Sequence, residues 1–197
     1  MKAFTTTTIS DINSLYGRTE LIELLEQMCT RENVPIYGCR RFGKSSLLKT
    51  FDSYARCKQL PVYPVYIEVD ASLLGDGSNS HFYSSLIIIL LRRLSSDGLS
   101  ACVEKVDGVR LNIDDKNLRS KLMRLNVASI NSLWKNVIIQ TSMKLRKTVL
   151  FMFDEYESLL SPNSKDLDLM PFHSLSSDSG VNDIKPFSFF ISGSDEW

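Results

Sequence analysis

The segment that most constrains this chain is GCRRFGKSSLL, residues 38–48. Two glycines bracket four residues, and a lysine and two serines follow at once. The run VPIYG, residues 34–38, is short and apolar, which predicts a buried strand. From Ser45 onward apolar residues recur at helical spacing, which predicts an amphipathic helix. The chain must therefore pass from a buried strand into a helix through a short glycine-bracketed loop.

The spacing of this loop is that of the phosphate-binding pattern G-x-x-x-x-G-K-[ST]. Its residues are Gly38, Cys39, Arg40, Arg41, Phe42, Gly43, Lys44 and Ser45, with Ser46 directly after them. Glycines let successive backbone N–H groups point at phosphate oxygens, and the helix N-terminus adds its positive dipole end. Lys44 then supplies a cation to the outer phosphates, and the Ser45 hydroxyl is a ligand for Mg²⁺.

Other strands and helices alternate along the rest of the chain. Apolar runs predict strands at 61–69, 148–153 and 187–191, with Pro64 placing the first of these at a sheet edge or giving it a late start. Periodic segments predict helices at 20–31, 81–95 and 118–138, and residues 96–117, 162–168 and 174–180 are expected to be loops. The alternation predicts an α/β layered fold with a mainly parallel sheet. Ligands in such folds bind at the carboxyl ends of the strands.

Polar residues follow each predicted strand. Asp154 and Glu155 come directly after five apolar residues, so one carboxylate can bind Mg²⁺ and the other can activate a water. A simple acidic helix cap is the alternative for this pair. Asp70 follows the strand at 61–69, and Ser192 and Ser194 follow the strand at 187–191. Either serine could contact a terminal phosphate, and an ordinary turn explains them equally well.

Taken together, GCRRFGKSS and VLFMFDE resemble the Walker A and Walker B motifs of P-loop ATPases that carry an extra strand between the two. The acidic pair favours this branch over small GTPases, and no [NT]KxD guanine motif is present. The upstream segment LYGRTELIELLEQM, residues 15–28, is similar to the opening of the archaeal and bacterial STAND-like ATPases, relatives of the AAA+ group. The loop residues Arg40, Arg41 and Phe42 match the same group.

This resemblance implies a three-layer P-loop NTPase fold over residues 16–197, with residues 1–15 as a lead-in. It implies ATP and Mg²⁺ as cofactors, with Tyr16, Gly17 and Arg18 near the adenine and Ser192 or Ser194 as the polar sensor. Members of the group continue with a fifth strand beside the phosphate-loop strand and then a helical lid, and we expect residues 1–197 not to include them. The strand at 34–37 is therefore expected to have an unpaired edge.

The leading hypothesis is a Mg²⁺-dependent ATP-binding and ATP-hydrolysing module that acts as a switch or motor. Lys44 and Glu155 are its expected catalytic residues, and Ser45 and Asp154 its metal ligands. A protein partner, or self-association through the missing lid region, would supply an arginine for fast turnover. The alternatives are a non-hydrolysing nucleotide-binding scaffold or truncated remnant, and a small-molecule or nucleotide kinase.

Composition narrows the remaining choices. Lys+Arg and Asp+Glu both number 23, so net charge gives no argument for a nucleic-acid or membrane surface, and DNA binding is implied by the resemblance alone. No apolar run approaches the roughly 20 residues of a membrane span. The four cysteines lack paired spacing, and the amino terminus lacks the apolar core of a signal peptide. We therefore expect a cytoplasmic protein without a membrane partner.

Overall fold

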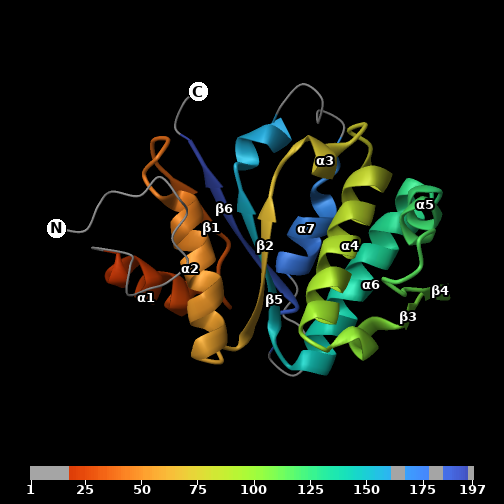
Figure 1. Ribbon diagram of the computed structural model, residues 1–197, viewed down its shortest axis with the longest axis horizontal. Helices are drawn as coiled ribbons and strands as arrows, with labels where there is room; N and C mark the ends of the chain where they lie inside the picture. Colours follow the sequence, from red (N-terminus) through yellow and green to blue (C-terminus); the bar gives the residue numbers. More distant parts are fainter. Residues whose placement is uncertain (1–17, 161–166, 178–183, 195–197) are drawn as a thin grey trace.

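The computed structural model describes residues 18–160, 167–177 and 184–194, and it shows helices on both faces of a parallel sheet (Figure 1). The strands of this sheet are β1 (Val34–Tyr37), β2 (Val62–Glu68), β5 (Thr148–Asp154) and β6 (Phe187–Gly193). Their order is β1-β6-β5-β2, and every neighbouring pair is parallel. The predicted α/β class with a parallel sheet is therefore confirmed.

Helices of two groups cover the two faces. On one face lie α1 (Thr19–Met28) and α2 (Lys44–Cys57). On the other lie α4 (Asn79–Ser96), α6 (Val127–Leu145) and α7 (Met170–Ser176). The short helices α3 (Ala71–Leu74) and α5 (Leu118–Met123) pack beside α4. None of the helices in the described part of the chain is long and apolar enough to cross a membrane.

The buried strand β5 shows how the two layers divide the core. All of its residues are buried, and successive side chains point to opposite faces. Val149, Phe151 and Phe153 join the larger core under α4, α6 and α7. Leu150 and Met152 join the smaller core under α1 and α2. By the same alternation, Asp154 belongs to the α2 face.

The two outer strands agree with the sequence expectations. Among the described residues β1 pairs with β6 alone, so one of its edges is open there, as predicted. At the other side of the sheet β2 pairs with β5 alone within the described ranges. Pro64 lies in β2, and an edge strand tolerates a residue that has no N–H to donate.

Two expected segments differ from the structure. Residues 96–117 were expected to be a loop, but they contain a 3-10 turn (Ser100–Val103) and a hairpin of β3 (Lys105–Val106) and β4 (Val109–Arg110). The hairpin's Asp107 and Gly108 both have positive φ, the conformation that a tight hairpin turn requires. Two-residue strands are too short for alternation to predict.

The prediction of a single helix at 118–138 is also wrong, because α5 and α6 are separate helices. Asn126 interrupts the pattern, because its extended backbone and its side chain, which accepts a hydrogen bond from Ser129 N at 2.8 Å, start a new helix. Downstream, the end of α7 lies inside the loop predicted at 174–180. Pro171 in the first turn of α7 favours initiation of this helix.

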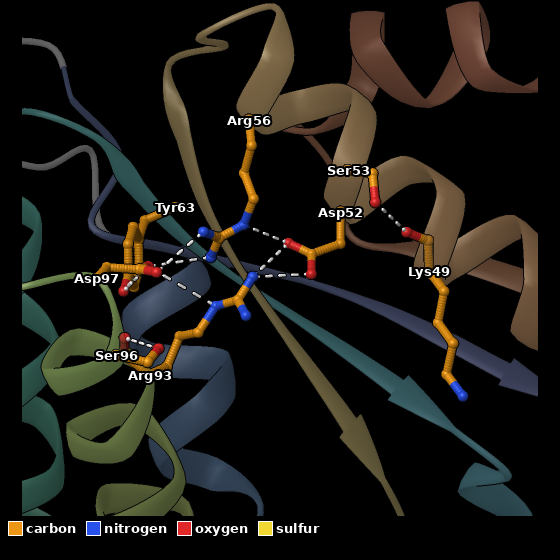
Figure 2. A network of polar contacts seen from close by, with 8 residues as sticks. All are labelled: Lys49, Asp52, Ser53, Arg56, Tyr63, Arg93, Ser96 and Asp97. Carbon is orange, nitrogen blue, oxygen red and sulfur yellow. Dashed lines mark hydrogen bonds and ion pairs between the residues drawn. The ribbon is translucent and has the colours of Figure 1, made fainter. Parts of the chain in front are cut away.

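An ion-pair cluster joins α2 to α4 across the edge strand β2 (Figure 2). Asp52 accepts hydrogen bonds from Arg56 at 2.9 Å and from Arg93 at 2.8 Å. Asp97 accepts two from Arg56 at 3.1 Å and one from the Tyr63 hydroxyl at 2.7 Å. Because the residues come from α2, β2 and the end of α4, the cluster ties both helical layers to this edge of the sheet.

Asp97 in this cluster should make stability depend on pH. Burial acts to raise the pKa of Asp97, but the hydrogen bonds from Arg56 and Tyr63 outweigh it and leave the pKa below its usual value. A lowered pKa stabilises the fold above the unfolded value of about 3.9, and that contribution is lost as pH falls. We expect Asp97→Asn to lower the free energy of unfolding by roughly 1–3 kcal/mol at pH 7.

Urea unfolding between pH 3 and pH 7 checks this expectation, because the gap between the two proteins should narrow below about pH 4. Asp115→Asn is the control, since it removes a more exposed pair with Lys121 and should cost less. A gap that stays constant with pH would contradict the assignment to the ionised Asp97.

Candidate nucleotide site

The phosphate-loop pattern forms the turn between β1 and α2. Tyr37 ends β1, and α2 begins at Lys44. Gly43 caps the helix with φ of +76°, a left-handed conformation that favours glycine, and Arg41 also has positive φ at 66°. The positive end of a helix dipole is its N-terminus, so in the 14-residue helix α2 that end faces the loop that precedes it. Loop and helix terminus thus lie where the spacing places them, and anion binding there stays a prediction.

Lys44 folds back over this loop. Its ammonium donates to the carbonyl oxygen of Gly38 at 2.6 Å and to that of Cys39 at 3.1 Å. The cation is therefore held inside the curve of the loop rather than extended into solvent. An ammonium has three N–H donors, so Lys44 has one donor beyond these two contacts.

Arg18 also contacts the loop. Its guanidinium donates to the carbonyl oxygens of Phe42 and Gly43, the second at 3.2 Å. These contacts hold the loop where it enters α2. The structure thus gives Arg18 a place beside the phosphate loop, and its predicted role near adenine stays a prediction. Tyr16 and Gly17 lie outside the described residues.

The other residues of the pattern differ in exposure between the loop and the start of α2. Cys39, Arg40 and Arg41 are exposed, and the Phe42 ring is 64% exposed. Ser45 and Ser46 lie in the first turn of α2 and are partly buried. Their binding roles remain predictions.

Asp154 lies at the carboxyl end of β5 and is only 3% exposed. Both of its oxygens are held by hydroxyls from the flanking strands. Ser192 of β6 donates to Oδ1 at 2.5 Å, and Tyr66 of β2 donates to Oδ2 at 2.7 Å. A carboxylate this buried needs such donors, since burial without partners costs several kcal/mol.

Tyr66 is a site residue that the sequence analysis missed. Burial, then the hydrogen bond to Asp154, raises the pKa of its hydroxyl well above the usual value, so the hydroxyl keeps its proton and donates it. The Lys49 ammonium lies 4.9 Å from the centre of the Tyr66 ring. A tyrosine inside an apolar strand looks like ordinary core, and only its position on the same face as Asp154 could have indicated the contact.

Glu155 and the next residues leave the sheet differently from Asp154. Glu155 is exposed and has a positive φ of 57°. A 3-10 turn (Tyr156–Leu160) follows, and Tyr156 packs edge-on against Tyr37 with ring centres 6.3 Å apart. Burial, then a hydrogen bond with Tyr37, raises the pKa of Tyr156 to about 12. Glu155 thus projects from the strand end, while the turn closes over the end of β1.

The two candidate sensor serines have different partners. Ser192 is fully buried and binds Asp154, whereas the Ser194 hydroxyl donates to Glu157 at 2.9 Å. Glu157 was not predicted as a site residue, and its loop position carried no pattern that would have found it. Asp70 is a helix cap, because its carboxylate accepts hydrogen bonds from the N–H groups of Ser72 and Leu73.

The donor set suits Mg²⁺ held together with phosphates. No group of three or more His, Cys, Asp or Glu side chains in the described ranges could hold a metal ion by itself. Mg²⁺ characteristically takes one or two protein carboxylates together with phosphate oxygens and water. Asp154 and the Ser45 hydroxyl are oxygen donors of that kind, so the residues fit the ion.

Comparisons with known proteins bear on the fold. No family model matches the chain, and no curated protein matches it in sequence. Solved structures do match. The Walker-type ATPase PabY2304 of Pyrococcus abyssi superposes with a TM-score of 0.59 at 19% identity over 96% of this chain. ORC2 of Aeropyrum pernix, in ADPNP–ADP complexes, superposes with a TM-score of 0.58 at 14% identity over 98% of it.

The chain has the P-loop NTPase fold. The ADP form of the same ORC2 protein gives a TM-score of 0.55 at 14% identity. This chain spans 48% of the Pyrococcus protein and 44% of ORC2, so it is similar to less than half of each. At these identities the likeness concerns the P-loop fold alone.

The close fit of the 3-10 turn over β6 can be tested at Gly193. A Cβ there would lie 2.6 Å from Tyr156 and 2.8 Å from Glu157. We expect Gly193→Ala to displace the turn and to lower the free energy of unfolding by about 1–3 kcal/mol, measured by urea unfolding. Ser194→Ala, which removes one hydrogen bond without adding bulk, should cost less. A Gly193→Ala protein as stable as the wild type would contradict the packing described here.

Proposed function

We propose that this protein binds ATP with Mg²⁺ and hydrolyses it slowly. The observation that carries the proposal is that the phosphate-loop pattern and a buried acid end two strands that flank the same strand, β6. At about 4.8 Å between neighbouring strands, the ends of β1 and β5 lie roughly 10 Å apart. That span suits a phosphate chain and its metal ion between Lys44 and Asp154.

Each residue has a distinct role in this proposal. The N–H groups of the loop and Lys44 bind the phosphates, and Arg18 keeps the loop in shape through its carbonyls. Ser45 and Asp154 hold Mg²⁺, which when bound neutralises charge on the phosphates. Glu155, exposed at the strand end, accepts a proton from the attacking water. ATP is favoured over GTP because the chain has the Asp-Glu pair and lacks a guanine-reading motif.

The wider biological setting is part of the same proposal. The solved neighbours are about twice as long as this chain, and a switch or motor module that works with a partner fits that relation. Such a partner, or a second copy, would provide the arginine that speeds hydrolysis. The four cysteines are free thiols, which supports a cytoplasmic setting. DNA binding rests on the STAND and AAA+ resemblance alone.

A non-hydrolysing nucleotide-binding scaffold is the second candidate. Lys44 is already bonded to loop carbonyls, and both oxygens of Asp154 already accept hydrogen bonds. These contacts fix the loop lysine and the Asp154 carboxylate in place. A site of this kind can hold a nucleotide as a structural element, with no requirement for turnover.

Removing Lys44 tests the nucleotide site. Titration of the purified chain with Mg²⁺-ATP, Mg²⁺-GTP and ADP should show saturable, adenine-selective binding. Lys44→Ala should weaken ATP binding at least tenfold, because charge-assisted bonds to phosphate are each worth roughly 1.5–3 kcal/mol. Lys58→Ala, at the other end of α2, is the matched control and should bind normally. Equal binding by both variants would refute the site.

Glu155 distinguishes hydrolysis from scaffolding. Glu155→Gln keeps the size of the side chain but removes the base, so phosphate release should fall about 10²–10⁴-fold while ATP binding persists. Glu104→Gln, an exposed residue in the 96–117 segment, is the control. Phosphate release at the same rate in the wild type and in Glu155→Gln would exclude Glu155 as the base. Binding without any turnover in the wild type would favour the scaffold.

A further inference from the structure

Three hydroxyl and carboxylate side chains meet on the α2 face of the sheet, and each comes from a different strand. The alternation along the strands places Tyr66 of β2, Asp154 of β5 and Ser192 of β6 on this face. Tyr66 is opposite Met152 in the register, so it reaches diagonally along β5 to Asp154. Its hydroxyl lies 2.7 Å from Oδ2. This contact therefore depends on strand register and would be lost by a shift of one residue.

We propose that Tyr66 is a positioning residue that holds Asp154 in the orientation needed to bind the Mg²⁺ that accompanies the nucleotide. The inference rests on the proposed function, because it names how this chain prepares its metal-binding carboxylate. Tyr66 itself contacts neither metal nor nucleotide in this role. It acts through one hydrogen bond, as the outer partners of metal ligands generally do.

The geometry explains why two hydroxyls are needed. Each carboxylate oxygen has about two lone-pair sites. With Ser192 on Oδ1 and Tyr66 on Oδ2, the carboxylate is fixed from both sides and cannot rotate without breaking a buried bond. One site on each oxygen remains for the metal ion or its water. Ser192 and Tyr66 both donate as neutral hydroxyls, so neither is an anion that would compete with Asp154 for the metal ion.

Tyr66 is itself secured from its outer side. The Lys49 ammonium of α2 lies over its ring at 4.9 Å, within the range of a cation–π contact. Both residues line a cavity of about 460 Å³ at the edge of the sheet, together with Val65, Ile89 and Arg92. The ring is therefore reached from the edge of the sheet while its hydroxyl points inward to Asp154. This arrangement links the β2 edge to the metal-binding carboxylate.

The chain contains a matched control for this tyrosine. Tyr63 lies three residues earlier in the same strand, and its hydroxyl also donates to a carboxylate, that of Asp97, at 2.7 Å. Tyr63 belongs to the ion-pair cluster of Figure 2. It lies near the amino end of β2, whereas the phosphate loop follows the carboxyl end of β1 in the same parallel sheet. Tyr63→Phe and Tyr66→Phe each remove one hydroxyl from one strand, and only the second removes a partner of Asp154.

The test measures binding, not turnover. A fluorescent non-hydrolysable ATP analogue is titrated into each protein without Mg²⁺, and then Mg²⁺ is titrated at fixed analogue. We expect Tyr66→Phe to raise the Mg²⁺ concentration for half-maximal effect about tenfold, at the low end of the 10–100-fold cost for outer partners of metal ligands. Analogue affinity without Mg²⁺ should be unchanged. Tyr63→Phe should leave the Mg²⁺ midpoint within about twofold of the wild type.

Each outcome decides between the proposals. Equal Mg²⁺ midpoints in the wild type and in Tyr66→Phe would overturn the positioning role while leaving nucleotide binding intact. Equal shifts in both tyrosine variants would assign the effect to general destabilisation and overturn it as well. Absence of analogue binding in the folded wild type would overturn the proposed function itself. Ser192→Ala tests the same carboxylate from β6 and should shift the Mg²⁺ midpoint in the same direction, even where Tyr66→Phe fails to fold.

Discussion

The buried carboxylate of Asp154 is the feature on which the rest of the site depends. A charge at the end of a fully buried strand is tolerated only with donors around it, and here the donors come from both neighbouring strands. Those strands must therefore be in register with β5 for the charge to be stable. β1 pairs in parallel with the other side of β6, so its loop opens at the same edge of the sheet as Asp154.

The edge strand β2 is held by polar contacts at both ends. Near its start, Tyr63 joins the cluster that ties α2 to α4, and further along Tyr66 joins Asp154. An edge strand lacks a neighbour on one side, so side-chain bonds to the flanking layers supply order that a second ladder would otherwise give. Because α2 follows the phosphate loop directly and carries Asp52 and Arg56 of this cluster, contacts at this edge of the sheet help to hold the helix at whose start the loop ends.

The sequence predicted those parts of the molecule whose signal is local. The phosphate loop, the amphipathic α2 and the apolar strand before Asp154 follow from spacing within about ten residues. The break at Asn126 was missed because apolar spacing continues across it, although asparagine before a helical run is a cap signal. Tyr66 and Glu157 were missed for a different reason. Their contacts with Asp154 and Ser194 join separate strands or turns, and no spacing within one segment encodes strand register.

The polar side chains of the candidate site hydrogen-bond to the protein itself, and these bonds affect the free energy of the proposed nucleotide binding. Lys44 donates to its own loop, Arg18 to the next carbonyls, and Asp154 accepts from Tyr66 and Ser192. Binding a triphosphate would exchange the Lys44 bonds for phosphate oxygens but would leave the hydroxyls on Asp154 in place. The net gain in binding free energy is then the difference between the Lys44 bonds to phosphate oxygens and its bonds to the loop carbonyls, not the full value of the former. Because the Asp154 contacts need not break in the proposed binding, most of the rearrangement would fall on the Lys44 side chain.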